Sequence, residues 1–159
     1  MSDEVKKLSA GDSAPQFSAQ NEDDKTVTSK DLAGKKAVIY FFPAAGSPGC
    51  TKEAADLQDN LQLFKKAGYE IYGVAPDKPK KLKSFVESHE LQFSLLSDPE
   101  LEMHKSWGAF GEKSMYGRIY KGSLRSTFAI DESGKVTHAL YNVKATGHAE
   151  MLKRQLGIS

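Results

Sequence analysis

Two hydrophobic patterns alternate along the chain, one typical of strands and the other of helices. The run 37–42 is continuously apolar, with β-branched and aromatic residues, as expected of a central strand covered on both faces. A second buried strand is predicted at 70–74 and a short one at 94–96. Turn sequences at 23–25 and 131–134 predict two hairpins. The first is an edge hairpin of the segments 13–17 and 26–28, and the second joins 126–130 to 136–141.

Apolar residues at helical spacing predict four helices between and after these strands. The clearest helix follows Cys50 and carries Ala54, Leu57, Leu61 and Phe64 on one face. We expect it to end near 67–68. The others are predicted at about 78–89, from 97–99 to about 107–108, and at about 148–156. The polar, glycine-containing stretch from 109 to about 122 is predicted to be a loop.

The order of these elements predicts the fold class. A strand, a helix and a second strand in succession imply parallel strands, and the later hairpin adds antiparallel ones before a closing helix. Together they predict an α/β fold of the thioredoxin-like kind, with a central mixed sheet flanked by helices. The chain has 159 residues, 39% of them hydrophobic, which suits a single domain covering 1–159.

The charge balance offers no general attraction to a polyanion. Lysine and arginine total 22 against 21 for aspartate and glutamate, so neither nucleic acid nor an anionic membrane is an expected partner. No apolar run approaches about eighteen residues, and the N-terminus lacks the apolar stretch of a secretory signal. We therefore expect a cytoplasmic protein. The basic segment 77–83 resembles a nuclear-import signal, but a solvated helix face explains the same charges, so a nuclear location stays open.

The histidines do not indicate a metal site. His89, His104, His138 and His148 do not fall at metal-ligand spacing with one another or with carboxylates. We therefore predict neither a metal nor an organic cofactor.

The chemistry that the sequence suggests centres on its one cysteine. A lone Cys50 excludes an intramolecular disulfide and the C-x-x-C motif, and composition alone favours a small buried hydrophobic residue. Its surroundings favour a reactive thiol. With Ser47 as N-cap and Pro48 as the first helical residue, the sulfur lies beside unpaired backbone N–H groups, which favour the thiolate. Arg125, before the strand 126–130, is a candidate cation above this turn, although an exposed strand-end charge is the simpler interpretation.

A motif around this cysteine resembles that of a known family. Pro43-x-x-x-Ser47-x-x-Cys50 is similar to the peroxiredoxin signature Pro-x-x-x-Thr/Ser-x-x-Cys. The string Pro48-Gly49-Cys50-Thr51-Lys52-Glu53-Ala54 resembles the Q-type subfamily, also called bacterioferritin comigratory protein. The resemblance extends over nearly the whole chain, through 95–98, 111–117, 125–128 and 144–148.

The resemblance implies a role for each residue that matches the family pattern. Cys50 corresponds to the peroxidatic nucleophile, and Ser47 to the hydroxyl that bonds both thiolate and peroxide. Pro43 corresponds to the residue that shields the sulfur from solvent. Arg125 corresponds to the arginine that stabilises the thiolate and orients the peroxide, and Glu53 to an acid that holds this arginine. On the residues alone, Glu53 is an ordinary acid in the first part of a helix.

Two departures from the family pattern bear on the mechanism. Many Q-type members have a resolving cysteine five residues after the first, where this chain has Ala55, and others have one near the position of Val86. Ala55 is either natural or an engineered loss of that thiol. The stretch 44–46 is Ala-Ala-Gly where relatives often have charged or polar residues, which implies a less polar rim of the site.

The activity implied by the resemblance is that of an antioxidant thiol peroxidase. It would reduce hydrogen peroxide and organic hydroperoxides through a Cys50 sulfenic acid and be recycled by an external reductant: thioredoxin, glutaredoxin or a small thiol. A redox sensor or chaperone-like binding protein, which turns over too slowly for a scavenger, is the first alternative. A thioredoxin-like module with an inert cysteine is the second. The preferred peroxide is left open, as is the oligomeric state, a monomer or a weak homodimer.

Overall fold

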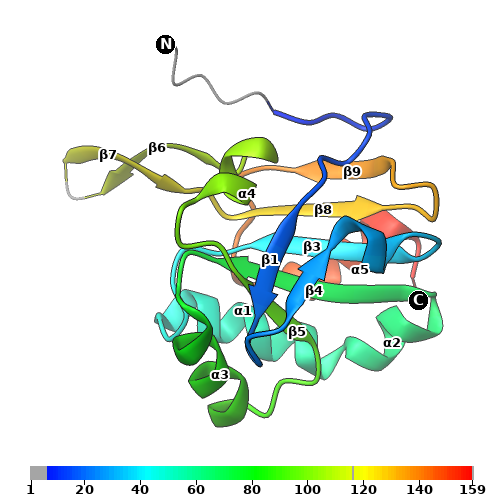
Figure 1. Cartoon of the computed structure of the whole chain (residues 1–159), viewed down its shortest axis with the longest axis horizontal. Helices are drawn as coiled ribbons and strands as arrows, with labels where there is room; N and C mark the ends of the chain where they lie inside the picture. Colours follow the sequence, from blue (N-terminus) through cyan, green and yellow to red (C-terminus); the bar gives the residue numbers. More distant parts are fainter. Residues whose placement is uncertain (1–6, 116, 159) are drawn as a thin grey trace.

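A seven-stranded mixed sheet forms the centre of this computed structural model, which describes residues 7–115 and 117–158 (Figure 1). The strands follow one another across the sheet in the order β2-β1-β5-β4-β3-β8-β9. Their bounds are β1 Ser18–Asn21, β2 Thr26–Thr28, β3 Lys36–Phe41, β4 Tyr69–Ala75, β5 Ser94–Ser97, β8 Ser126–Ile130 and β9 Val136–Leu140.

Strand β3 lies inside the sheet with a partner on each side. It runs parallel to β4, with Val38 opposite Ile71, and antiparallel to β8, with Ile39 opposite Phe128. Every residue of β3 after Lys36 is buried. Because both faces of this strand are covered, apolar side chains occupy consecutive positions. The prediction of a buried interior strand is confirmed.

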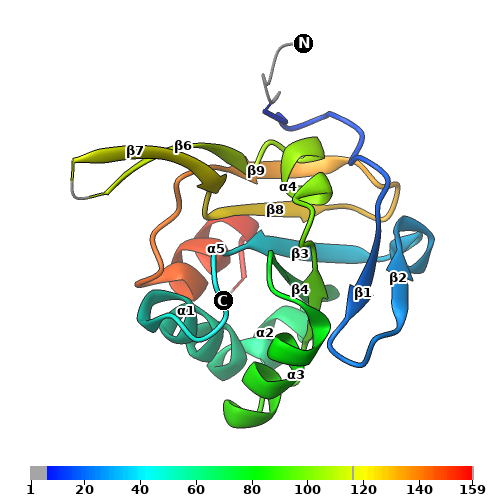
Figure 2. The ribbon, with the colours of Figure 1, turned by 60° about the vertical axis from the view of Figure 1, so that its left-hand side comes forward.

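Helices cover both faces of the sheet (Figure 2). On one face lie α1 Pro48–Asp59, α2 Leu61–Lys66, α3 Pro79–Ser88 and α5 His148–Leu156; on the other lie α4 Glu102–Ser106 and a 3-10 helix, Ser29–Leu32. Because strand side chains alternate between faces, Val38 and Tyr40 join the core under the first group, and Ile39 and Phe41 join the second core. Among the described residues, none of the helices has the length and apolar composition needed to cross a membrane.

The helix predicted to run from Cys50 to about 67–68 is divided in two. α1 ends at Asp59 and α2 begins at Leu61, with Asn60 between them at φ −108° and ψ 6°. The Asn60 side chain donates a hydrogen bond to the Asp56 carbonyl oxygen at 2.8 Å. Asparagine side chains compete in this way with the backbone hydrogen bonds of a helix, which explains the break. The apolar spacing continues across Asn60, so the sequence pattern did not indicate it.

A two-stranded arm replaces the loop predicted up to Gly122. β6 Phe110–Met115 and β7 Arg118–Ser123 pair antiparallel, with Gly111 opposite Gly122. Both ribbon views show the arm projecting from the main sheet (Figures 1 and 2). The loop prediction was wrong because this stretch is rich in polar residues and glycine, and such strands lack the apolar alternation that marks a half-buried strand.

The N-terminal edge hairpin is present, but its first strand was misplaced. β1 spans Ser18–Asn21, whereas the segment 13–17 contains no strand and makes an isolated bridge between Ser13 and Lys135. β1 also pairs with β5, which the hairpin turn alone did not indicate. The hairpin of β8 and β9 and the closing helix α5 agree with their predictions.

A buried Asp98–His104–Ser123 relay joins α4 to the end of the arm. Asp98 accepts hydrogen bonds from the His104 backbone N–H at 2.8 Å and contacts His104 Nδ1 at 2.7 Å, while His104 Nε2 lies 2.8 Å from Ser123 Oγ. The predicted start of this helix at 97–99 was wrong, since its N-cap is Leu101 at φ 61°. The relay contains the residue types of a hydrolase triad, but His104 is 0% exposed, so it has no access to a substrate. The relay is therefore a structural anchor, and its last member, Ser123, lies two residues before Arg125.

Candidate active site

Cys50 lies in the first turn of α1 and is almost fully buried, at 1% exposure. Ser47 has the extended backbone of an N-cap and Pro48 is the first helical residue, as predicted. However, the Ser47 side chain makes no capping hydrogen bond, and its hydroxyl donates to the Ala44 carbonyl oxygen at 3.0 Å. The first N–H groups of a helix have no partner inside it, and such a helix start favours negative charge.

The turn between β3 and α1 is held by Asp77, which follows β4. Asp77 Oδ2 accepts a hydrogen bond from the Ala45 N–H at 2.7 Å, and the Asp77 carbonyl oxygen accepts one from Ser97 Oγ at 2.6 Å. Pro43 lies half-buried at the start of this turn, directly after the buried end of β3. The turn is therefore fixed from the neighbouring strands, which determines where the first turn of α1 begins.

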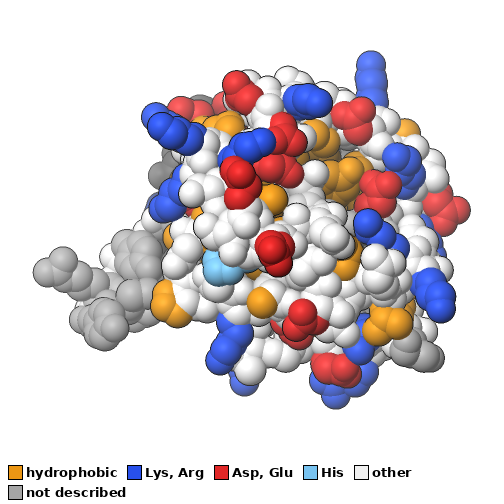
Figure 3. Space-filling model, turned by 90° about the horizontal axis from the view of Figure 1, so that it is seen from below, with side chains coloured by type: hydrophobic (Ala, Val, Ile, Leu, Met, Phe, Trp, Pro, Cys, Tyr) orange, Lys and Arg blue, Asp and Glu red, His pale blue; other side chains and the backbone are white. Residues whose placement is uncertain are grey.

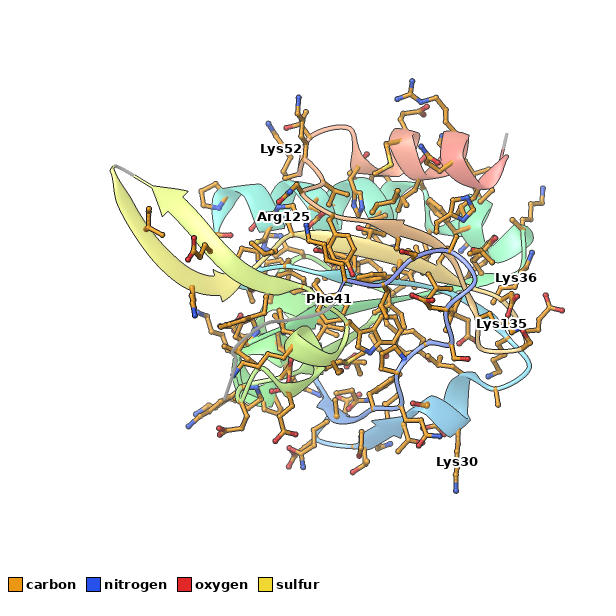
Figure 4. The ribbon with its side chains drawn as sticks, turned by 90° about the horizontal axis from the view of Figure 1, so that it is seen from above. Lys30, Lys36, Phe41, Lys52, Arg125 and Lys135 are labelled. Atoms are coloured by element: carbon orange, nitrogen blue, oxygen red, sulfur yellow. The ribbon has the colours of Figure 1, made fainter. Side chains whose placement is uncertain are left out.

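Arg125 connects the thiol to a buried carboxylate. Its Nη2 donates a hydrogen bond to Cys50 Sγ at 3.4 Å, and its Nη1 donates one to Glu53 Oε1 at 2.5 Å. A Cβ atom at Gly49 would lie 3.4 Å from Nη2, so the guanidinium rests directly against the first turn of α1. Figure 4 shows Arg125 at the same end of the molecule as Lys52 of α1, near the arm, whereas Lys36 and Lys135 lie at the other end. The structure thus brings Cys50, Glu53 and Arg125 together.

Burial and charge determine the protonation states of these groups. Burial raises the pKa of Glu53 to about 7, against the opposing effect of the Arg125 guanidinium. Burial lowers the pKa of Arg125, but the charges of Glu53 and Cys50 outweigh this effect and raise the pKa overall, so Arg125 stays positive. Burial also raises the pKa of nearby Tyr40, with Glu53 and Cys50 adding to the shift, so this phenol stays neutral.

His148 lies behind the Arg125–Glu53 pair. Its Nδ1 is 3.1 Å from Glu53 Oε2, although the two atoms are not aligned for a well-formed hydrogen bond, and its Nε2 is 2.7 Å from Thr127 Oγ1. Burial, assisted by the charge of Arg125, lowers the pKa of His148 to about 4, so the ring is neutral at pH 7. Sequence reasoning considered this histidine only as a metal ligand and missed it. Its place at the end of the segment 144–148, one of the stretches of family resemblance, was the available signal.

The positions at which relatives have a resolving cysteine lie on two different helices. Ala55 is exposed on α1 and Val86 is half-buried on α3. Over the described part of the chain, no group of three or more His, Cys, Asp or Glu side chains is arranged to hold a metal ion.

A thioredoxin-like sheet with an arginine-bound cysteine at the start of a helix is the setting expected of a reactive thiol. Comparison with known proteins agrees. The model of the AhpC/TSA family matches residues 10–139, and the chain belongs to this family, as a peroxiredoxin of the Q-type, or bacterioferritin comigratory protein, subfamily. The protein is therefore a thiol-dependent peroxidase, and the predicted fold class and subfamily are confirmed.

Relatives and solved structures match nearly the whole chain. A Mycobacterium tuberculosis protein named as a peroxiredoxin is 49% identical over 152 residues, covering 96% of this chain and 97% of the relative. Peroxiredoxin Bcp of Escherichia coli is 41% identical over 145 residues, covering 91% and 93%. Peroxiredoxin Q of Xanthomonas campestris has a TM-score of 0.83 at 34% identity, covering 89% of this chain and 90% of the other. A Xylella fastidiosa PrxQ mutant has a TM-score of 0.88 at 28% identity, covering 96% and 97%.

Proposed function

We propose that Cys50 is the peroxidatic nucleophile and that Arg125 is the residue that activates it. The observation that carries this proposal is the Arg125 guanidinium, which donates one hydrogen bond from Nη2 to Cys50 Sγ and another from Nη1 to Glu53 Oε1. An arginine presents its donors in a rigid fork, so an anchor on one side fixes the donor on the other. A charge-assisted donor at the sulfur favours the thiolate, which is the attacking form.

The reaction is a two-electron oxidation of the thiolate. Cys50 Sγ attacks one peroxide oxygen, the new S–O bond forms as the O–O bond breaks, and the departing oxygen takes up a proton to leave as water or an alcohol. The sulfur becomes a sulfenic acid. In this proposal Arg125, whose Nη2 already donates to Cys50 Sγ, and the first-turn N–H groups stabilise the charge that develops on the departing oxygen.

Three further residues support this step in the proposed mechanism. Ser47 gives up its bond to the Ala44 carbonyl oxygen and bonds the thiolate and the peroxide. Pro43 shields the sulfur, consistent with the 1% exposure of Cys50. Glu53 holds Arg125 through Nη1.

Reduction of the sulfenic acid requires a thiol from outside the chain, since the sequence has one cysteine. We propose thioredoxin, glutaredoxin or a small thiol for this role. Because Cys50 is buried at a helix start, the first turn of α1 must unwind locally before another thiol reaches the sulfur. The proposed setting is antioxidant defence in the cytoplasm.

The proposed substrates are hydrogen peroxide and organic hydroperoxides. The bacterioferritin comigratory protein of X. campestris, 33% identical, has been studied for its alkyl peroxide reduction activity.

We further propose a monomer or a weak homodimer. On the face drawn in Figure 3, acidic and basic side chains are interspersed, with no broad area of one sign. Size-exclusion chromatography over a range of protein concentrations tests this assignment.

Stopped-flow kinetics test the proposed role of Cys50. The rate with hydrogen peroxide and with cumene hydroperoxide is measured over about pH 4 to 9. Removal of a charged hydrogen bond worth about 1.5 to 3 kcal/mol predicts that Arg125→Ala slows the reaction by about 10- to 150-fold. Arg125→Lys is also slow, because an ammonium cannot reproduce the fork. Arg154→Ala, an exposed arginine on α5, is the matched control. A wild-type rate equal to that of a free thiol and unchanged in Arg125→Ala would refute the proposal.

A further inference from the structure

His148 is a buried polar group to which the mechanism above assigns no role. The side chains of His148 and Glu53 are both 0% exposed, and Nδ1 of the first lies 3.1 Å from Oε2 of the second. Across the described residues, neither atom has a well-formed hydrogen bond elsewhere. Each is therefore the available polar partner of the other, and burying both without an interaction would be costly.

The contact with Thr127 is compatible with a His148 tautomer that has its proton on Nδ1. A neutral imidazole has one N–H donor and one acceptor nitrogen. Thr127 Oγ1 lies 2.7 Å from Nε2. When the threonine hydroxyl donates its proton to Nε2, the imidazole proton must be on Nδ1, which faces Glu53. A small rotation of the ring then aligns Nδ1–H with Oε2.

We propose that His148 is a positioning residue for the peroxidase reaction. Its Nδ1–H holds Oε2 of Glu53, the ionised carboxylate keeps Oε1 on Arg125, and the guanidinium is thereby held on Cys50. The path joins α5, α1 and the segment before β8 into one connected set of contacts. The inference rests on the proposed role of Cys50 and assigns it a second layer of support.

The groups around this path show which one changes charge near neutral pH. Tyr40 of β3 faces His148 at 5.9 Å between ring centroids and stays neutral, and Arg125 stays positive. Asp56 of α1 accepts the Ala149 N–H at 2.8 Å and so fixes the start of α5. Glu53 titrates near pH 7, since burial raises its pKa to about 7.

Loss of the Nδ1 donor favours the protonated form of Glu53, because that donor stabilises the charged form. The pKa of Glu53 then rises above its value of about 7, so fewer molecules at pH 6.5 keep the ionised Glu53 that anchors Arg125, whereas at pH 9 most of them keep it. A purely structural role of His148 would instead reduce the rate by the same factor at every pH. The pH dependence of the deficit therefore distinguishes positioning from packing.

The closing experiment compares two amide replacements of His148 by stopped flow with hydrogen peroxide. A glutamine amide reaches about as far as Nε2 and loses the contact to Glu53, whereas an asparagine amide reaches about as far as Nδ1 and can donate to Glu53. We expect His148→Gln to slow the reaction about tenfold at pH 6.5, equivalent to 1.4 kcal/mol, and less than about threefold at pH 9. His148→Asn should recover most of this loss. His89→Gln is the control, since His89 is the exposed C-cap residue of α3.

A double-mutant cycle with Glu53→Gln completes the test. In the Glu53→Gln background, His148→Gln should have no further effect, because the carboxylate through which it acts is gone. Additive effects, equal losses in both amide variants or a deficit independent of pH would overturn the inference. Should His148→Gln fail to fold, Thr127→Val must show a smaller deficit with the same pH dependence, and an unchanged profile would count against the inference. A fast, Arg125-dependent wild type with an additive cycle refutes this inference alone, whereas a slow wild type refutes both proposals.

Discussion

Stability should respond to acid in opposite directions when Glu53 and His148 are replaced one at a time. The pKa of Glu53 is about 7 in the fold and 4.5 in its absence, so between these values the folded state binds more protons than the unfolded state. Acidification through this range therefore stabilises the fold. The pKa of His148 is about 4 in the fold against 6.5, so the unfolded state binds more protons and acidification destabilises the fold.

In the wild type the two contributions nearly cancel. The folded pair takes up its protons near pH 7 and 4, and the unfolded residues take them up near 6.5 and 4.5, so the total uptake is similar. Each contribution alone amounts to about 3 kcal/mol, at about 1.4 kcal/mol for each pH unit between the folded and unfolded pKa. Relative to wild type, Glu53→Gln should thus lose up to about 3 kcal/mol between pH 7 and 4.5. Relative to wild type, His148→Gln should gain a similar amount between pH 6.5 and 4.

Urea unfolding at several pH values between about 4 and 7.5 measures this effect. The difference in the free energy of unfolding between variant and wild type is plotted against pH, so that contributions from other groups cancel. His89→Gln is the control, since this exposed histidine lies outside the buried pair. Differences that do not change with pH, or that have the same sign in both variants, would refute the assigned charge states.

Three further changes test the packing and the thiol chemistry. Gly73→Ala places a Cβ 2.9 Å from the Tyr40 ring, so overpacking should cost about 1 to 3 kcal/mol in urea unfolding, and an unchanged midpoint would contradict the buried contact. Ser123→Ala leaves His104 Nε2 buried without its partner, which should cost about 1 to 3 kcal/mol, whereas a cost near zero would contradict the anchor. Ala55→Cys should form an intramolecular disulfide with Cys50 after one equivalent of peroxide, which mass spectrometry detects. The five residues from 50 to 55 rise about 7.5 Å along the helix, which is farther than a disulfide spans, so the bond requires α1 to unwind. Its absence would indicate that α1 does not unwind.

Elements with a strong apolar period were predictable, and those without one were not. The strand at 37–42 and the closing helix at 148–156 were recognised because burial on two faces, or on one helical stripe, selects apolar residues at regular positions. The arm of β6 and β7 was missed because its strands are polar and pair with each other. The break at Asn60 was missed because the apolar spacing continues through it.

The candidate site was predictable where its residues are close in sequence. Ser47, Pro48 and Cys50 belong to one helix start, so backbone geometry places the sulfur beside the first-turn N–H groups. Arg125 is 75 residues away from Cys50, and the sequence favoured it only through family resemblance. His148 carried no signal of its own, since a lone histidine shows its partners only after the chain has folded.

The sequence by itself determined the strongly periodic strands and helices, the class of fold and the candidate reactive thiol. Hydrophobic periodicity and the residues that start a helix depend on sequence neighbours, so they can be recognised without knowledge of the fold. Only the tertiary structure decided that Arg125, Glu53, His148 and Thr127 form one buried path behind the thiol. Their contacts and altered pKa values depend on desolvation and on charges from distant segments, and these arise only when α1, β8 and α5 pack together.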